Sequence, residues 1–206
     1  MLVYHQTDQP ADVGKTGPNN QYFNGKKCAP PPSTSISTID PTDRLAQSIR
    51  LDLVGRGYFE SVSLAFMSPK WVGRCGIQAI ELDNPLGEET RYLRTDLRPA
   101  LIDAVALNRR YGRPDVRLVE YAHRFEAEGE YNTIAWVGSW GAEPVKAYAQ
   151  CRGEIEAILG SRGVHGLRYE PLLESDRLLH PRSAAAIYAG ECKLGHLGEL
   201  HPELRD

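Results

Sequence analysis

The sequence predicts an α+β fold, with an antiparallel sheet that carries helices against one face. Two observations support this class. Segments with the 3.6-residue apolar period of helices are interspersed with runs of segments that have the two-residue period of strands, joined by short turns. The regular alternation of strand and helix that marks a doubly wound parallel sheet is absent. At 206 residues the chain can hold one core, or one domain with an appended arm.

Residues 1–41 differ in composition from the rest, and we expect them to form an extended or partly disordered arm. They are rich in proline, including the run Pro30-Pro31-Pro32, and poor in aliphatic side chains. Such a segment buries too little apolar surface to offset the entropy lost on ordering. The folded domain is therefore expected to span residues 42–206.

The first helix is predicted to begin at Asp40, because Asp-Pro-Thr-Asp supplies a capping acceptor, a proline in the first turn and a further acid. Leu45, Ile49 and Leu53 then form an apolar stripe that ends at Gly55. Residues 62–66 alternate between large apolar and small side chains, which predicts a half-buried strand. Residues 76–82 are a second, shorter strand candidate.

A second helix is predicted where Leu97, Leu101 and Val105 share one face, with Thr95 or Asp96 as its cap. We expect it to close over residues 108–112. The remaining periodic segments predict strands at 116–125, 133–140, 166–171, 184–190 and 194–200, and a third helix at 145–159.

Composition excludes several classes of protein. The net charge of −3 lacks the basic excess of a dedicated nucleic-acid binder, and no apolar run approaches the roughly 18–20 residues of a membrane span. The four cysteines are far apart, which favours reduced thiols over a disulfide framework or a zinc site. His196 and His201 do not have the spacing of a metal-binding pair on one helix face. We expect a cytoplasmic protein with no metal site and no membrane association.

Several short motifs, in order along the chain, resemble the β subunit of bacterial phenylalanyl-tRNA synthetase. The run from Leu82 to Asn108 contains the family's Asn-Pro-Leu turn, its Leu-Arg-Thr and its Leu-x-Pro helix start. Residues 57–62, 118–122 and 146–156 are similar to its next signatures. Two His-Pro turns near the end match as well. The matching residues that we take as determinants of fold or interface are Asn84, Pro85, Arg94, Leu97, Leu101, Val105, Asn108, Glu120, His180, Pro181, Gly198, Glu199, His201 and Pro202.

The resemblance covers about residues 42–206 and implies a class II aminoacyl-tRNA synthetase-like fold. It also implies a core that has no aminoacylation site of its own and packs against an α subunit, which holds ATP and Mg²⁺. The helix that bears Leu97, Leu101 and Val105 would supply a buried, apolar interface. Alone, the domain would self-associate through that surface. The family's editing and tRNA-binding domains do not fit in 206 residues. Ala100, Ala122 and Arg182 depart from its glycines, which puts local turns in doubt but not the fold.

Two other functions remain open. Arg124 and Glu126 echo the Arg-x-Glu of the family's adenylate-binding motif, which would suit a free-standing paralogue that makes an aminoacyl adenylate. However, the late glycine-rich element with its arginine has no match, so we interpret the two residues as an exposed strand pair. The second alternative is a module that binds tRNA weakly through a band of arginines. Acids interleave that band, which favours a solvated mixed face. The band consists of Arg91, Arg94, Arg98, Arg109, Arg110, Arg113 and Arg117.

Arg94 stands apart from this band, because it lies between an apolar residue and a helix start. A buried guanidinium needs a carboxylate partner. Glu120, in an otherwise apolar strand, is the predicted one.

Overall fold

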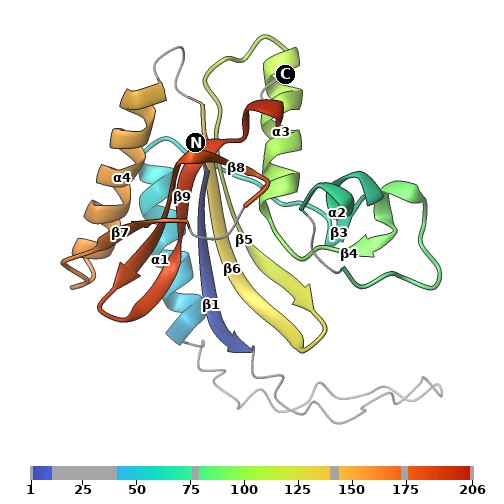
Figure 1. Cartoon of the computed structure of the whole chain (residues 1–206), viewed down its shortest axis with the longest axis horizontal. Coiled ribbons are helices and arrows are strands. Elements are labelled where there is room, and N and C mark those ends of the chain that lie inside the picture. The colour runs from blue at the N-terminus through green and yellow to red at the C-terminus, as the bar shows by residue number, and fades with distance from the viewer. Residues whose placement is uncertain (1, 11–40, 76–78, 140–143, 173–175, 205–206) are drawn as a thin grey trace, which may run out of the picture.

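A seven-stranded sheet forms the centre of the molecule (Figure 1). The computed structural model describes residues 2–10, 41–75, 79–139, 144–172 and 176–204. The strands follow the spatial order β2-β5-β6-β1-β9-β8-β7, and every neighbouring pair is antiparallel except β2 and β5. Their bounds are β1 Leu2–Pro10, β2 Phe59–Glu60, β5 Arg117–Glu126, β6 Gly129–Gly138, β7 Arg168–Pro171, β8 Leu179–Ala189 and β9 Cys192–Leu200.

Helices cover both faces of the sheet, so the expectation of helices against one face was wrong. On one face, α1 (Pro41–Gly55) and α4 (Pro144–Gly160) bury Leu53 and Ile155 against Val119 of β5 and Leu197 of β9. On the other face, α3 (Arg98–Arg110) buries Leu101 against Val137 of β6. Alternate residues of β6 enter the two cores, as the two-residue period of a strand requires.

A small lobe lies beside α3 and leads into it. It contains α2 (Pro69–Cys75), the 3₁₀ turn η1 (Glu88–Thr90) and a two-stranded sheet of β3 (Phe66–Met67) and β4 (Tyr92–Leu93). Met67 and Trp71 of this lobe pack into the core beneath α3. A second 3₁₀ turn, η2 (Pro202–Leu204), follows β9.

The structure corrects three predictions made from the pattern. Leu2–Pro10 is a strand in the middle of the sheet, so this part of the predicted arm belongs to the folded domain, while residues 11–40 lie outside the described ranges. Residues 62–65 form no strand, and the part of the 76–82 candidate that is described contributes only an isolated bridge at Glu81. The other predicted helices and strands are present within a few residues of their expected bounds. In the part of the chain described here, no helix is long and apolar enough to cross a membrane.

Candidate functional site

The open edge of the sheet beside β5 is formed by residues 59–66, which we call the edge segment. The chain leaves α1 through Gly57, whose φ of 90° is one that L side chains rarely adopt. Tyr58 is then buried, and its hydroxyl donates a hydrogen bond to Glu154 Oε2 at 2.8 Å. Burial, with Cys151 and Glu154 nearby, raises the pKa of Tyr58, so the hydroxyl keeps its proton. Phe59 and Glu60 pair with β5, and the Ser61 amide continues that pairing to Val119 O at 2.8 Å.

Large apolar side chains of the edge segment point into solvent. Phe59 is 74% exposed, Val62 90% and Leu64 69%, and we call these three residues the apolar ridge. The alternation at 62–66 predicts a half-buried strand, but Val62 and Leu64 face outward, and only Phe66 among its large apolar residues is partly buried. Exposed apolar residues that cluster on one edge are typical of a surface that another protein covers.

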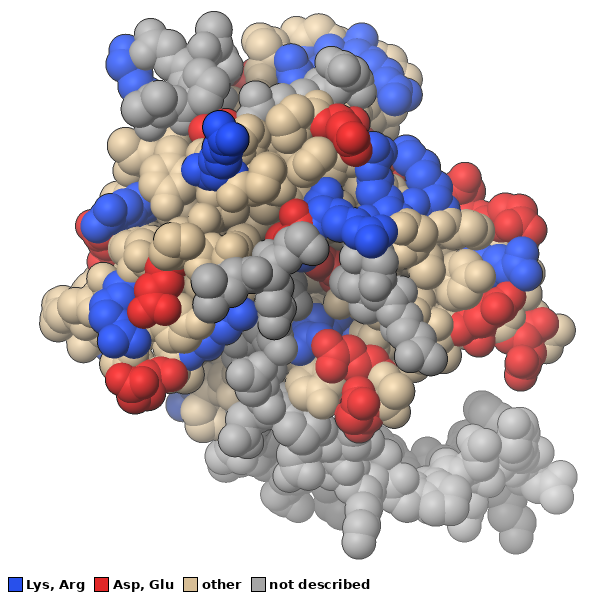
Figure 2. Space-filling model, viewed as in Figure 1, with Lys and Arg blue, Asp and Glu red and all other residues tan. Residues whose placement is uncertain are grey.

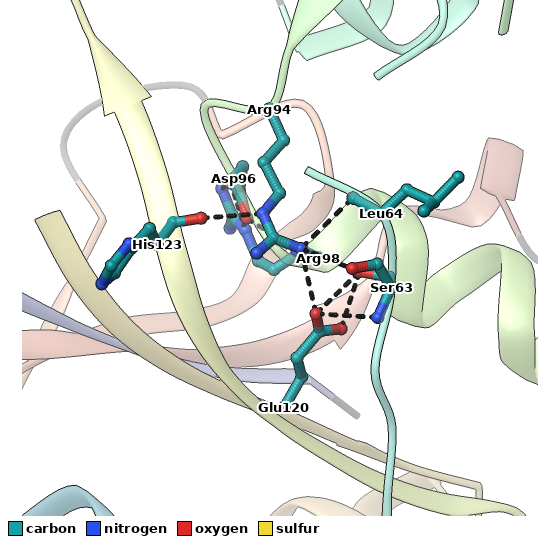
Figure 3. A network of polar contacts seen from close by, with 7 residues as sticks. All are labelled: Ser63, Leu64, Arg94, Asp96, Arg98, Glu120 and His123. Carbon is teal, nitrogen blue, oxygen red and sulfur yellow. Dashed lines mark hydrogen bonds and ion pairs between the residues drawn. The ribbon is translucent and has the colours of Figure 1, made fainter. Parts of the chain in front are cut away.

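A buried ion pair anchors the edge segment to the sheet (Figure 3). Arg94 Nη1 lies 3.0 Å from Glu120 Oε1, which confirms the predicted pairing, and both side chains are almost fully buried. The same Glu120 oxygen accepts hydrogen bonds from the Ser63 amide at 3.1 Å and the Ser63 hydroxyl at 2.7 Å. The carboxylate on β5 therefore holds the backbone between Val62 and Leu64 in place.

Arg94 extends this anchor to both sides. Its Nε donates to the His123 carbonyl of β5 at 2.7 Å, while its Nη1 donates to the Ser63 hydroxyl at 2.9 Å. Its backbone amide donates to Ala65 O, and its carbonyl accepts from the Phe125 amide. Burial lowers the pKa of Arg94, and the Glu120 charge opposes that shift. A guanidinium remains charged at neutral pH in either case.

A second buried ionic cluster lies at the start of α3. Arg98 binds Asp96 through its Nε at 2.7 Å and through its backbone amide at 2.8 Å, and its Nη1 contacts Asp176 Oδ2. Burial alone would lower the pKa of Arg98, but the two carboxylates raise it overall. For Asp176, burial alone would raise the pKa, but the positive charge of Arg98 brings that pKa below its usual value. The cluster ties the first turn of α3 to the chain that leads into β8.

His196 of β9 lies beside this second cluster. Burial is the main cause that lowers the pKa of His196 to about 4, and the positive charges of Lys193 and Arg98 add to the shift. At neutral pH the imidazole is therefore uncharged.

Arg124 and Glu126 form an ion pair within β5, as predicted, but Arg124 is buried and not exposed. Its guanidinium also stacks over the Tyr131 ring, 4.6 Å from the ring centroid. The arginine that echoes the adenylate motif therefore has an ion-pair partner and a stacking partner from its own hairpin, since Tyr131 lies directly across from Arg124 in β6.

The two His-Pro turns lie next to each other. Leu179 pairs with Leu200, and the His201 amide donates to Leu178 O at 2.8 Å. His180 and His201 each accept a hydrogen bond at Nδ1 from the amide two residues later, so both stabilise their own turns. Pro202 opens η2. A hollow of about 510 Å³ between the turns is lined by both polar and apolar residues, among them Arg74, Asp176, Arg177, His180, Pro181 and His201.

The helix face predicted as an interface is instead part of the domain's own core. Leu97 and Leu101 are fully buried against the sheet, and Val105 packs beside them, so they are not available to a partner. α3 closes within the predicted residues 108–112, with Tyr111 as its C-cap, and the Asn108 carbonyl accepts hydrogen bonds from the Tyr111 and Arg113 amides. Leu97, not Thr95 or Asp96, occupies the N-cap position.

The remaining predicted residues are spread over the molecule. Asn84 and Pro85 are exposed in the loop of the small lobe. Gly198 of β9 allows close packing, since a Cβ there would lie 2.7 Å from the Ala184 Cβ. Glu199 accepts a hydrogen bond from the Ser183 hydroxyl at 2.9 Å. The structure therefore unites Arg94 with Glu120, and the two His-Pro turns with each other, but it does not bring all the predicted residues to one site.

Sequence reasoning missed the apolar ridge, Ser63 and the partners of Arg98. One signal was available for Arg98. A basic residue in the first turn of a helix is opposed by the helix dipole, and the first turn of α3 contains no acid. Such a residue calls for carboxylates nearby, and Asp96 is two positions away.

Comparisons with known proteins agree with this fold. A family model described as the phenylalanyl tRNA synthetase beta chain CLM domain matches residues 27–206. The phenylalanine--tRNA ligase beta subunit of Geobacter sulfurreducens is 29% identical over 199 residues, and that of Shewanella oneidensis is 30% identical over 200 residues. These alignments cover 85% and 89% of this chain, respectively, and 25% of each relative. The chain thus spans about a quarter of the length of the curated relatives it matches.

Solved structures give the same fold at low sequence identity. A pyrrolysyl-tRNA synthetase from Desulfitobacterium hafniense superposes with a TM-score of 0.59 at 15% identity, over 76% of this chain and 55% of that one. A histidine--tRNA ligase subunit from Alicyclobacillus acidocaldarius gives a TM-score of 0.55 at 16% identity, over 72% and 46%. The sheet is thus that of a class II aminoacyl-tRNA synthetase, and the chain belongs to the family of the phenylalanyl-tRNA synthetase β-chain CLM domain.

Proposed function

We propose that this domain is a non-catalytic scaffold of a phenylalanine--tRNA ligase, which binds the α subunit through the apolar ridge of its edge segment. The observation that carries the proposal is the exposure of Phe59, Val62 and Leu64 on a segment that a buried ion pair fixes. Burial of one large apolar side chain contributes about 1.5–3 kcal/mol, so a partner that covers all three gains substantially. A rigid backbone also lowers the entropy lost on binding.

The task of holding the edge segment explains why the Arg94–Glu120 pair is present so close to the surface. Replacing such a pair by apolar residues is often neutral or stabilising, so stability alone is a weak reason for it. Glu120 binds the Ser63 amide and hydroxyl, and Arg94 also binds the Ser63 hydroxyl, all between the ridge residues Val62 and Leu64. We infer that the pair sets the direction in which Val62 and Leu64 project.

The state of Arg124 supports a scaffold more than an adenylating enzyme. A guanidinium that stabilises a transferred phosphoryl group must be accessible to that group. Arg124 is instead buried, paired with Glu126 and stacked on Tyr131. On this proposal ATP and Mg²⁺ bind to the α subunit, and the assembled ligase works in the cytoplasm.

The proposal is tested by capture of a phenylalanine--tRNA ligase α subunit on the immobilised domain. A ridge variant carrying Phe59→Ser, Val62→Ser and Leu64→Ser should lose capture by at least tenfold. A matched control carries Leu86→Ser and Leu107→Ser, two exposed apolar residues away from the edge segment, and should retain capture. If the ridge variant retained capture as well as the control does, the ridge would be rejected as the interface. ATP–pyrophosphate exchange with phenylalanine by the domain alone would reject the non-catalytic assignment.

A second candidate function, weak RNA binding, is favoured by one group of arginines. The predicted band divides in the structure: Arg94 and Arg98 are buried in ion pairs, and Arg91 binds Glu81. Arg109, Arg110 and Arg113, after the middle of α3, are exposed and form no ion pair with any described residue. Tyr111 between them is 79% exposed. Arginines beside an exposed aromatic ring suit a sugar-phosphate backbone.

This candidate is tested by the salt dependence of tRNA binding. Positive and negative side chains are mixed over the face of the molecule in Figure 2, and the net charge is −3, so any binding of tRNA should be weak. Replacing all three by alanine should lower the slope of log affinity against log salt by about one per lost phosphate contact. A control that replaces Arg50, Arg91 and Arg152, each paired with a carboxylate, removes the same charge and should leave the slope unchanged. No binding at low salt would exclude the function.

A further inference from the structure

The strand β1 is unusual because it joins two halves of the sheet that have no pairing with each other among the described residues. β2, β5 and β6 form one half, and β9, β8 and β7 form the other. Leu2 to His5 pair with residues 134–137 of β6 on one side and with residues 195–198 of β9 on the other. β6 and β9 run parallel to each other, because each is antiparallel to β1.

The two strands that flank β1 lie at the centre of both cores. Ile134 and Leu197 are buried on the face covered by α1 and α4, while Ala135 and Val137 are buried on the face covered by α3. Without β1, both strands would present open hydrogen-bonding edges between the two cores. An open edge of this kind accepts another extended segment.

The strand is also separate from the rest of the domain in sequence. The family match starts at residue 27, after β1, and α1 begins at Pro41. The connecting residues 11–40 can span at most roughly 100 Å when fully extended. A connection of this length is long enough to reach a neighbouring molecule as well as its own sheet.

We propose that Leu2–Pro10 is an exchangeable strand, and that the slot between β6 and β9 also accepts the same segment from a second copy of the chain. The result is a strand-swapped dimer in which every pairing of β1 is kept and only the connection changes course. Such exchange is a low-cost route to a dimer, because it creates no new interface that must be stabilised. The monomer predominates in dilute solution, where a tethered strand has an effective concentration of about millimolar order.

Complementation between two defective chains tests the exchange. One chain carries Tyr4→Pro, which removes an amide from the stretch that is paired on both sides and spoils the donor strand. The other carries Ala135→Asp, which places a charge in the core under α3, on the strand β6 that borders the slot, and spoils the acceptor. Each chain alone should lose its cooperative unfolding transition. Refolded together, they should give a heterodimer with one native sheet, detected by light scattering and by amide exchange protection at residues 134–137.

Three results would overturn the proposal. The first is that Tyr4→Pro unfolds at the same temperature as the unaltered chain and as Asp8→Pro, a control in β1 outside both registers; β1 would then not complete the sheet. Failure to recover any heterodimer would show that the strand is not exchanged. A heterodimer without protection at residues 134–137 would show association elsewhere. Because this slot is separate from the apolar ridge, each of these outcomes leaves capture of an α subunit unaffected.

Discussion

The edge segment and α3 present similar apolar patterns but use them in opposite ways. α3 places Leu97 and Leu101 at helical spacing, and both are fully buried against the sheet. The edge segment places Val62 and Leu64 two residues apart, and both are exposed. The difference lies in what stands behind each element. α3 packs on β6 and β5, inside the sheet, whereas the edge segment has β5 on one side and no further strand of the described sheet on the other.

This comparison teaches that an apolar pattern identifies a face but not what covers it. The apolar face of α3 is covered by the domain itself, so its contribution is to stability. The ridge is covered by nothing in the described chain, and polar groups, not apolar packing, hold its backbone in place. Changes to the anchor, to α3 and to the ridge should therefore have clearly different effects on the free energy of unfolding.

The largest effect should come from breaking the anchor. Glu120→Ala leaves the guanidinium of Arg94 buried without its carboxylate, which should lower the free energy of unfolding by about 3–5 kcal/mol. Arg94→Ala should cost a similar amount, and the double variant should cost much less than the sum of the two. Urea denaturation followed by circular dichroism measures all three. Additive losses would show that the two residues act independently and would weaken the role assigned to the anchor.

The next largest effect on the free energy of unfolding should come from the buried face of α3. Leu101→Ala removes a fully buried side chain and should lower the free energy of unfolding by about 2–5 kcal/mol. Leu107→Ala, on the same helix but 52% exposed, is the matched control and should change it by less than about 0.5 kcal/mol. If Leu101→Ala were as mild as the control, the face of α3 would be an open surface and the original interface prediction would return.

An intermediate effect should follow from acid. Folding lowers the pKa of His196 to about 4, against an ordinary value of 6.5, so the unfolded chain takes up a proton first as the pH falls. Stability is thus complete above about pH 6.5 and declines toward pH 4, by at most about 1.4 kcal/mol per pH unit. The lowered pKa of Asp176 adds a further loss only below its ordinary value of 3.8.

Two variants separate the contributions to this acid sensitivity. His196→Gln should flatten the stability profile between pH 6.5 and pH 4, since the replacement does not titrate. Replacement of His165, whose ring lies near Gly160 on the other side of the fold, is a control that should keep the slope. An unchanged profile in His196→Gln would assign the acid loss to other groups. The charged groups that act on His196 are those of Lys193, Arg98, Asp176 and Asp96.

The sequence was sufficient where a structural cause is local. Helical spacing located α3 and α4, and alternation located β5, β8 and β9, because these patterns depend on near neighbours. Arg94 and Glu120 could be paired from charge alone, since both are charged residues in apolar surroundings. The exposure of Val62 could not be predicted, because it depends on where the sheet ends.

Long-range partners were the other limit. Arg98 and Asp176 are 78 residues apart in sequence, and nothing local to either one indicates the other. β1 was missed because its few apolar residues stand next to a proline-rich segment, and its place is fixed by strands more than 120 residues later. The partner of Arg98 and the strands that flank β1 are therefore set by the topology of the fold and not by local composition.

The smallest effect on stability, and the sharpest contrast with α3, should come from the ridge itself. Val62→Ser with Leu64→Ser removes two apolar side chains that are already in water, so the free energy of unfolding should change by less than about 1 kcal/mol. The same variant should bind an α subunit at least tenfold more weakly. Urea denaturation and capture on the same preparation measure the two quantities together. A large loss of stability would mean that the edge segment packs against the domain after all, and the ridge would then belong with α3.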